Sequence, residues 1–272
     1  MAMLRAHAGT WTDDLLERLD PEGEVARGLE RQIRAYLDLS QCRGKRLLDF
    51  GCGVGASSLA LARLLPDTDI VGVELNPEQV ALGNHLRNIH QLPNLRFIAS
   101  PAGDQLPPAL GVFHYITLSA VYEHLLPVER RTIMPLLWRA LEPGGMLFIS
   151  GTPHRWFPVE HHTTGLWGLN YLPRSVALPL ARRWGKSPGT AGWAAYLRAG
   201  IRGGTEREMR RNCGDEPVIA QPLNGDRAGY WLSGVSPRHR TIKRTLARIF
   251  RITDRFFDTI PSTHVEVVFK KP

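Results

Sequence analysis

A glycine-rich turn after a short apolar segment constrains the fold of this chain more than any other feature. The apolar segment is residues 46–50, and the turn Gly51-Cys52-Gly53-Val54-Gly55 follows directly. Glycine adopts backbone angles that a side chain would forbid, so the chain can reverse tightly and approach a ligand closely. A helix is predicted over 56–65, and its first N–H groups have no intrahelical partners. These residues predict a strand, a turn and a helix, with a candidate ligand site at the turn.

Strand and helix patterns alternate through residues 45–150. Short apolar runs predict strands, and runs with apolar residues at helical spacing predict the helices between them. Alternation of this kind indicates βαβ units with right-handed crossovers, so we expect an α/β fold with a doubly wound, Rossmann-like sheet. The predicted strands are 46–50, 70–74, 95–99, 112–118, 146–150 and 264–270, and the predicted helices are 56–65, 77–89 and 128–141.

The regular alternation stops after Gly151. Residues 151–202 contain four of the seven tryptophans and several prolines, which predicts a cap inserted after the fifth strand. Most of these tryptophans are expected to form the small core of the cap, and the alternative is an apolar acceptor pocket. The predicted organisation is N-terminal helices in 1–44, which include Leu15, Leu16 and Leu19, a ligand-binding core in 45–150, the cap in 151–202, and 203–272 completing the core.

A long amphipathic helix is predicted from Thr241 to about Phe257. Such an apolar stripe usually packs on the protein's own core, which is our expectation here. The alternative is an interfacial helix that rests on an anionic lipid surface. The stripe consists of Ile242, Leu246, Ile249, Phe250, Phe256 and Phe257.

Charge is unevenly distributed along the chain. Residues 151–272 contain 20 of the 34 Lys and Arg residues but only 9 of the 26 Asp and Glu residues. We expect a solvated basic surface; the alternatives are an anionic substrate, a lipid surface or nucleic acid. Nucleic acid is not the expected partner, because no dense basic block with interleaved aromatic residues occurs.

Cysteine usage and hydropathy indicate the cellular setting. The three cysteines form no C-x-x-C pair, so neither a disulfide framework nor a zinc site is expected, and a reducing cytoplasm is the expected location. No apolar run reaches the length of a membrane span.

Glu74 adds a second constraint on the ligand. It ends the second predicted strand, 19 residues beyond Gly55. Consecutive strand ends of a doubly wound sheet are adjacent at the edge where ligands bind, and a carboxylate there can accept both hydroxyls of a ribose. The alternative is an acid that caps the helix beginning at Pro77. The turn lacks the third glycine of the dinucleotide fingerprint, so hydride transfer is not favoured.

Four stretches of the chain, in this order and spacing, resemble the class I S-adenosylmethionine-dependent methyltransferases. They are residues 47–55, 71–76, 119–124 and 141–147, and the resemblance covers about 45–150 and, more weakly, the last strand. It implies a mostly parallel seven-stranded sheet with helices on both faces, S-adenosyl-L-methionine as the cofactor, and a methyltransferase activity.

The resemblance also implies roles for particular residues. Asp49 and the glycines hold the methionine part of the cofactor, Glu74 holds the ribose, and Leu75 lies beside the adenine. Glu123 and His124 occupy a position that often lines the methyl-transfer site. The candidate cofactor residues are Asp49, Gly51, Cys52, Gly53, Gly55, Glu74, Leu75, Ala120, Glu123 and Asp104, which stands a few residues beyond the acidic position usual in the family.

The segment after the fifth strand supplies candidate bases. A hydroxyl acceptor needs a proton acceptor, and histidine titrates near neutral pH. We expect His161 or His162 to take that proton, and the alternative is a histidine pair that caps a turn. His124 and His154 are further candidates. No metal site is expected, because the consecutive side chains of His161 and His162 diverge in most conformations.

These observations predict an enzyme that transfers a methyl group to a small-molecule acceptor, with oxygen as the favoured acceptor atom. The alternatives are nitrogen, sulfur or carbon as the acceptor atom, and a lipid-linked or glycan acceptor. An alternative of another class is a catalytically idle fold that serves as an interaction module. The acceptor's identity and the oligomeric state are left open.

Overall fold

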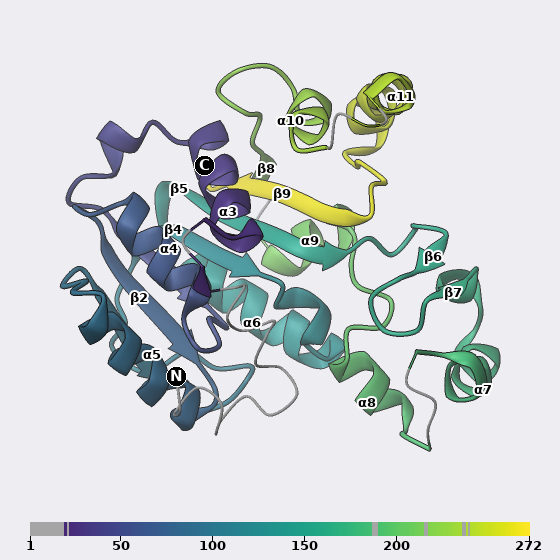
Figure 1. Ribbon diagram of the computed structural model, residues 1–272, viewed down its shortest axis with the longest axis horizontal. Helices are drawn as coiled ribbons and strands as arrows, with labels where there is room; N and C mark the ends of the chain where they lie inside the picture. Colours follow the sequence, from purple (N-terminus) through teal and green to yellow (C-terminus); the bar gives the residue numbers. More distant parts are fainter. Residues whose placement is uncertain (1–18, 21, 187–189, 215–216, 236–237, 239) are drawn as a thin grey trace. The chain divides into compact units, whose positions relative to one another are not determined.

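The computed structural model describes residues 19–20, 22–186, 190–214, 217–235, 238 and 240–272. It consists of two compact units, Met1–Ser100 and Pro101–Pro272, which we call unit 1 and unit 2 (Figure 1). Leu15 and Leu16, predicted to be helical, lie outside the described residues. The predicted limits of the four sequence regions remain predictions.

Unit 1 is built on three parallel strands in the order β3-β2-β1. Phe50 pairs with Val73 and Glu74 pairs with Ala99, so the three strands end at the same edge. Apolar residues on the inner positions of β1 and β2 are fully buried, as a strand covered on both faces requires. The elements are β1 (Arg46–Phe50), α4 (Ala56–Leu64), β2 (Asp69–Glu74), α5 (Pro77–Ile89) and β3 (Leu95–Ala99), close to their predicted limits.

Helix α3 (Glu24–Tyr36) precedes this sheet, followed by the short 3-10 helix η2 (Leu39–Cys42). It buries Leu29, Ile33 and Tyr36, which recur at helical spacing, as the prediction of N-terminal helices in 1–44 requires. Helix α3 packs against α4, so the N-terminal helix belongs to the core of unit 1.

The ring of Phe97 fills a space that three glycines leave open in unit 1. A Cβ atom built on Gly55 would lie 2.4 Å from Phe97 Cζ, and one on Gly72 would lie 2.5 Å from Phe97 Cδ1. One on Gly83 would lie 3.1 Å from the same ring. Glycine is therefore required at Gly55 for packing as well as for its φ of +93°.

Unit 2 contributes four strands in the order β4-β5-β9-β8. Strands β4 and β5 are parallel, whereas β9 runs antiparallel to both β5 and β8. The described residues thus form seven strands of a mostly parallel sheet, which confirms the predicted fold class. The elements are β4 (Phe113–Ser119), η3 (Tyr122–His124), α6 (Pro127–Arg139), β5 (Leu141–Pro153), α9 (Glu206–Cys213), β8 (Val218–Ile219) and β9 (His264–Lys270).

Strand β5 is longer than predicted. It begins at Leu141 rather than Met146, because Gly144 at φ +75° carries the chain through the turn and the register with β4 shifts between Phe113 and Tyr115. A turn signal at Gly144-Gly145 therefore marks an irregularity inside the strand and not its beginning.

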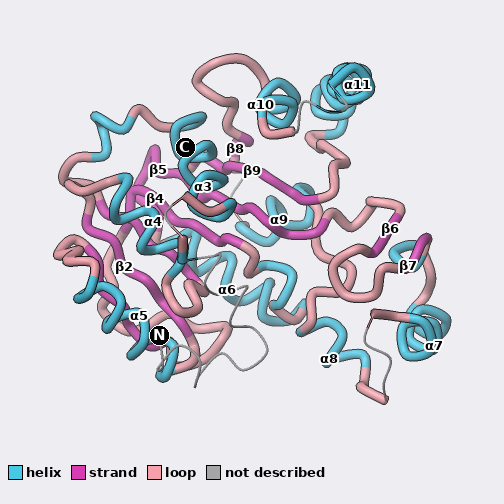
Figure 2. The backbone as a smooth tube through the Cα atoms, viewed as in Figure 1, coloured by secondary structure: helices cyan, strands magenta, loops and turns pink. Residues whose placement is uncertain are grey.

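The cap has a core of its own, but the tryptophans do not form it. Its buried cluster is Leu169, Ala177, Ala181, Tyr196 and Ile201. The expectation of a tryptophan core is wrong for Trp156, Trp167 and Trp184, which are exposed; Trp193 alone of the four packs against the cluster. The segment leading into α7 is mostly loop (Figure 2). The elements are β6 (Val159–Glu160), β7 (Leu166–Trp167), η4 (Leu169–Tyr171), α7 (Arg174–Trp184) and α8 (Trp193–Arg198).

The long C-terminal helix α11 (Arg240–Phe257) forms where it was predicted, beside α10 (Arg227–Ser233). The expectation that its apolar stripe packs on the core holds for Phe250 and is wrong for the other five residues, Ile242, Leu246, Ile249, Phe256 and Phe257. Ala247 and Phe250 are buried against α10 and its surroundings, but Ile242 and Phe256 are 64% and 70% exposed.

No helix among the described residues combines the length and the apolarity that a membrane crossing requires.

The contact between Phe97 and the glycine turn can be tested by substitution. Gly55→Ala is expected to lower the free energy of unfolding by about 3 kcal/mol, because left-handed strain and a clash with the ring add together. Gly44→Ala is the matched control: Gly44 also has a positive φ, +68°, but nothing lies within 4 Å of its added Cβ. It is expected to cost about 1 kcal/mol. Urea denaturation measures both, and equal losses would contradict the packing role of Phe97.

Candidate functional site

The turn between β1 and α4 is held in a left-handed conformation. Gly51, Gly53 and Gly55 have φ angles of +72°, +57° and +93°. The N–H groups of Gly51 and Cys52 both donate to the carbonyl oxygen of Val73, at 2.7 and 3.1 Å, which fixes the turn to the end of β2. Glycine thus occupies the three positions of the turn at which a residue with a side chain would strain the backbone.

The carboxylate of Glu74 joins the ends of the two strands. Its Oε2 accepts a hydrogen bond from Gly53 N at 2.9 Å, and its Oε1 accepts from Leu75 N at 2.8 Å and Asn76 N at 3.0 Å. The helix cap of α5 is Asn76, whose side chain accepts from Glu78 N. The alternative that Glu74 caps this helix is therefore wrong. Glu74 lies at the glycine turn beside the half-exposed Leu75.

Asp49 and Cys52 are buried beneath the turn. The Oδ2 of Asp49 accepts hydrogen bonds from the hydroxyls of Ser57 and Ser58, at 2.5 and 2.6 Å, so this carboxylate positions the first turn of α4. Burial, followed by the negative charges of Asp49 and Glu74, raises the pKa of the Cys52 thiol well above its ordinary value. The thiol is consequently neutral and unreactive.

In unit 2, the chain after β4 contains a strained alanine and a buried acid. Ala120 has a φ of +55°, in the left-handed region that alanine rarely adopts. Glu123 is completely buried; its Oε2 accepts from Thr152 Oγ1 at 2.8 Å, whereas its Oε1 has no hydrogen-bond partner among the described residues. Burial raises the pKa of Glu123. This unpaired Oε1 is available to a proton, to a hydrogen-bond donor of a ligand, or to a cation.

His124 and His162 lie around that free oxygen. His124 Nδ1 is 2.7 Å from the carbonyl oxygen of Arg198, so this nitrogen carries the proton and donates it, and Nε2 is left with a lone pair. His124 Nε2 is 3.8 Å from Glu123 Oε1, and the rings of His124 and His162 are 5.5 Å apart. Burial, followed by the charge of His124, lowers the pKa of His162.

One ligand atom from each of Glu123, His124 and His162 lies within 4.8 Å of the others. Two imidazoles and a carboxylate can share a proton, and the same donor set can hold a transition-metal ion. No metal site was expected from the sequence, because the neighbouring side chains of His161 and His162 diverge, and the approach of His162 to residues almost 40 positions earlier has no local signal.

Gly200, which was not a predicted site residue, completes this cluster. It has a φ of +91°, and a Cβ there would lie 2.8 Å from His162 Nε2 and 3.2 Å from Glu123 Cγ. The residue follows α8 and lets the cap approach the cluster closely. A glycine after a helix signals a turn, but the sequence does not tell which side chains lie against it.

His161 lies in a different environment from His162. Its Nε2 is 3.1 Å from His264 Nε2, at the start of β9, so one imidazole of this pair donates and the other accepts. Burial, followed by the charges of His161 and His162, lowers the pKa of His264 to about 4. His264 was predicted only as the first residue of a strand, because its partner lies 103 residues away.

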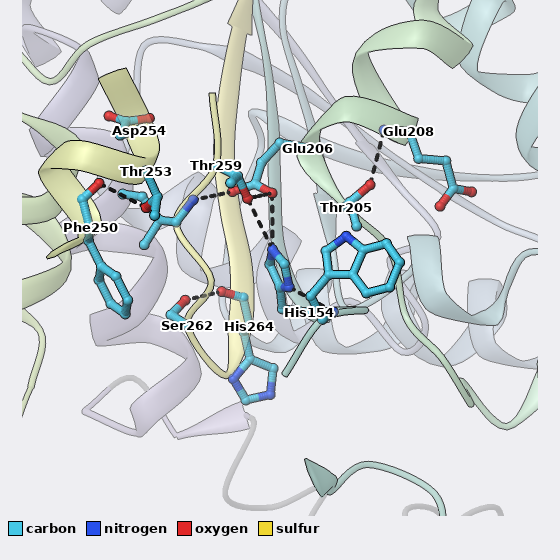
Figure 3. Close-up of polar contacts among 12 residues, drawn as sticks. His154, Thr205, Glu206, Glu208, Phe250, Thr253, Asp254, Thr259, Ser262 and His264 are labelled. Carbon is cyan, nitrogen blue, oxygen red and sulfur yellow. Dashed lines mark hydrogen bonds and ion pairs between the residues drawn. The ribbon is translucent and has the colours of Figure 1, made fainter. Parts of the chain in front are cut away.

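His154 is bound within a buried polar network (Figure 3). The N–H of Trp156 donates to His154 Nδ1 at 3.1 Å, so Nε2 carries the proton and faces Glu206 Oε2 at 3.3 Å. Burial raises the pKa of Glu206, but hydrogen bonding and charge from His154, with the charge of Arg227, outweigh it and hold the pKa below its ordinary value. His154 follows β5 and Glu206 begins α9, so their contact joins these two elements.

Two further acidic residues are Glu160 and Asp104, of which Asp104 was a predicted site residue. Glu160, beside the histidine pair, accepts hydrogen bonds from the N–H groups of Thr163 and Thr164 and thereby closes a turn. Asp104 lies partly exposed in a turn of unit 2. The structure therefore brings Glu123, His124 and His162 together, whereas His161 contacts His264 and His154 contacts Glu206.

Comparisons with known proteins identify the family. A family model described as a methyltransferase domain matches residues 47–145. Demethylmenaquinone methyltransferase of Beutenbergia cavernae is 33% identical over 181 residues, which cover 65% of this chain and 68% of that protein. An O-methyltransferase of Aspergillus nomiae is 32% identical over 147 residues, covering 53% of this chain and 61% of that protein.

A solved structure agrees at the level of the fold. The TehB-like methyltransferase of Corynebacterium glutamicum superposes with a TM-score of 0.50 at 14% identity, covering 98% of this chain and 99% of that chain. The chain belongs to the class I S-adenosylmethionine-dependent methyltransferases. It spans less than half the length of several other curated relatives that it matches.

The histidine pair predicts an acid-sensitive fold. Above pH 6.5 His264 is neutral whether the chain is folded or unfolded, so the stability that this pair contributes is fully present. As the pH falls toward 4, the unfolded chain takes up a proton that the folded chain excludes, and stability is lost. We expect a loss of about 2 kcal/mol from this group, allowing for solvent screening.

His264→Gln is expected to lose less stability between pH 7 and pH 4 than the wild-type chain. Urea denaturation across that range measures the difference. His85→Gln, on the exposed side of α5, serves as the control and is expected to follow the wild type. Parallel pH curves for the His264 variant and the wild type would refute the assignment.

Proposed function

We propose that unit 1 binds S-adenosyl-L-methionine through the glycine turn and Glu74. The observation that carries this proposal is the hydrogen bond between Glu74 and Gly53, which holds a carboxylate at the tip of a left-handed glycine turn. A ribose hydroxyl can replace a backbone N–H as the donor to this carboxylate. Leu75 exposes an apolar side chain next to it, as an adenine contact requires. The carboxylate of Glu74, the glycine turn and the exposed apolar side chain of Leu75 therefore fit the cofactor.

We propose further that the chain is an enzyme that methylates a small-molecule acceptor. When bound, S-adenosyl-L-methionine supplies an electrophilic methyl carbon on a sulfonium. The acceptor atom must be held about 3 Å from that carbon, in line with the breaking bond. Among relatives, one is named for demethylmenaquinone, which supports a small-molecule acceptor, and another is named as an O-methyltransferase, which supports oxygen as the acceptor atom.

The cluster of Glu123, His124 and His162 is the proposed proton acceptor for that hydroxyl. His124 Nε2 has a lone pair, because its Nδ1 proton is donated to Arg198 O. The lowered pKa of His162 keeps it neutral near pH 7, so it too can accept a proton. His161 and His154 are engaged by His264 and Glu206, and we propose that they position the cap rather than take the proton. The cluster favours oxygen over sulfur or nitrogen, since a hydroxyl needs the most help in losing its proton.

Cofactor binding tests the first proposal. Glu74→Ala is expected to weaken binding of S-adenosyl-L-methionine by about 10- to 100-fold, because a charge-assisted hydrogen bond is lost. Isothermal titration calorimetry measures the affinity. Glu78→Ala, four residues further on in the first turn of α5, is the control and is expected to bind like the wild type. A wild-type chain that does not bind the cofactor would favour the idle interaction module.

Turnover tests the second proposal. His124→Ala and His162→Ala are each expected to lower methyl transfer by about 100-fold while leaving cofactor affinity unchanged, since a general base contributes on that order. Formation of S-adenosylhomocysteine with menadiol, hydroquinone and catechol as probe acceptors measures the rate. His85→Ala is the control for histidine loss at an exposed site.

The same assay separates the proton-acceptor role from metal binding. If the cluster acts through its own imidazoles, EDTA leaves turnover unchanged. Loss of activity in EDTA that returns with Zn²⁺ would contradict the proposed role, as would full turnover in both histidine variants.

A further inference from the structure

The outer face of helix α11 is apolar and uncovered. Its side chains are more than a third exposed, and Phe256 and Phe257 are each 70% exposed. Residues spaced three and four apart lie on one side of a helix, so these side chains form a continuous stripe. Exposed single apolar residues are ordinary, but a stripe along about four turns is not. The stripe consists of Ile242, Leu246, Ile249, Ile252, Phe256 and Phe257.

The stripe is not needed to attach α11 to unit 2. Phe250, at one edge of the stripe, makes the attachment: it packs on Ala228 and stacks edge-on against Trp231 with ring centroids 4.7 Å apart. Ion pairs reinforce this attachment, from Arg227 to Asp254 and from Arg251 to Asp226. Figure 1 shows α11 beside α10 at the margin of unit 2. The helix is therefore held in place with its apolar stripe facing solvent.

Positive charge borders the stripe. Residues 240–257 contain six Lys and Arg residues and one acid, Asp254. Asp254 is turned inward to Arg227, so it does not offset the charge of the outer side. Arg244, Arg248 and Arg255 are exposed and, at 100° per residue, lie next to the apolar stripe on the side away from Phe250.

We propose that α11 docks the protein on an anionic lipid surface. An apolar stripe bordered by arginines suits the boundary between acyl chains and phosphates, where the apolar side chains insert and the guanidinium groups reach the phosphates. Charge complementarity favours this occupant over an apolar protein groove, because anionic lipid attracts a basic helix, and Asp258, the acid that follows Phe257, is paired with Arg210. The inference does not depend on the proposed methyl transfer.

Vesicle binding by the full chain tests this inference. Co-sedimentation is measured with vesicles of phosphatidylcholine alone and of phosphatidylcholine with 30% phosphatidylglycerol. We expect partitioning onto the anionic vesicles to be at least about tenfold stronger. Ile249→Asp with Phe256→Asp is expected to lower it by at least about tenfold, and Arg244→Glu with Arg248→Glu to abolish the preference for phosphatidylglycerol.

Val128→Asp is the matched control, because Val128 is also an exposed apolar residue in a helix of unit 2. It is expected to bind vesicles like the wild type. Since all substituted side chains are exposed, each variant should keep the wild-type melting temperature and S-adenosyl-L-methionine affinity, which separates this inference from the proposed function.

Two results would overturn the inference. One is equal binding of the wild-type chain to both kinds of vesicle, or equal binding of the Ile249/Phe256 variant and the wild type to the anionic ones. The other is a dimer in sedimentation velocity that the same variant converts to monomer while neither binds vesicles, which would assign the stripe to a second copy of the chain.

Discussion

The hydrogen bond from Gly53 to Glu74 is the interaction on which the candidate cofactor site depends. It links two strand ends that are already parallel and in register, and it does so through a backbone that only glycine adopts without strain. The ring of Phe97 supports the turn from below, where any larger residue at Gly55 or Gly72 would collide with it. The position of the carboxylate is thus a consequence of sheet geometry and packing. A hydroxyl of a ligand can take the place of the Gly53 N–H as a hydrogen-bond donor to it.

Unit 2 depends on buried charges instead. Glu206 is almost fully buried and is satisfied by His154, by Thr259 and by the backbone N–H of Ile260. Arg227 adds a second charge that is also paired with Asp254. Removing one partner of such a network leaves an uncompensated charge, which costs far more than losing a surface pair. This network joins β5, α9 and the segment that follows α11, so it fixes the strand from which the cap begins.

The parts of the fold that the sequence predicts well are those that local patterns determine. In unit 1, strands and helices between Arg46 and Ala99 agree with the prediction to within a residue or so, because apolar periodicity and glycine punctuation mark each boundary. The positions of Glu74 and of the glycines at the strand ends follow from the same local sequence patterns. The start of β5 does not, because a glycine turn can interrupt a strand without ending it.

What the sequence could not supply depends on contacts between distant residues. The pairing of His161 with His264 and the approach of Gly200 to His162 and Glu123 have no local signal. The exposure of Trp167 and of the α11 stripe contradicts what apolar side chains usually do, so only the tertiary arrangement reveals it. Nothing in the sequence distinguishes His161 from His162 as a candidate base. In the structure their partners differ, because His161 contacts His264 and His162 lies beside His124.

The contact between α8 and His124 gives the cap an influence on acid–base chemistry. The carbonyl oxygen of Arg198 holds the proton on Nδ1 of His124, and Arg198 is tied back by its ion pair with Glu129. If α8 moved away to admit a ligand, the imidazole would be free to exchange tautomers, and the basic nitrogen would no longer be defined. The position of α8 therefore decides which ring nitrogen of His124 carries the proton.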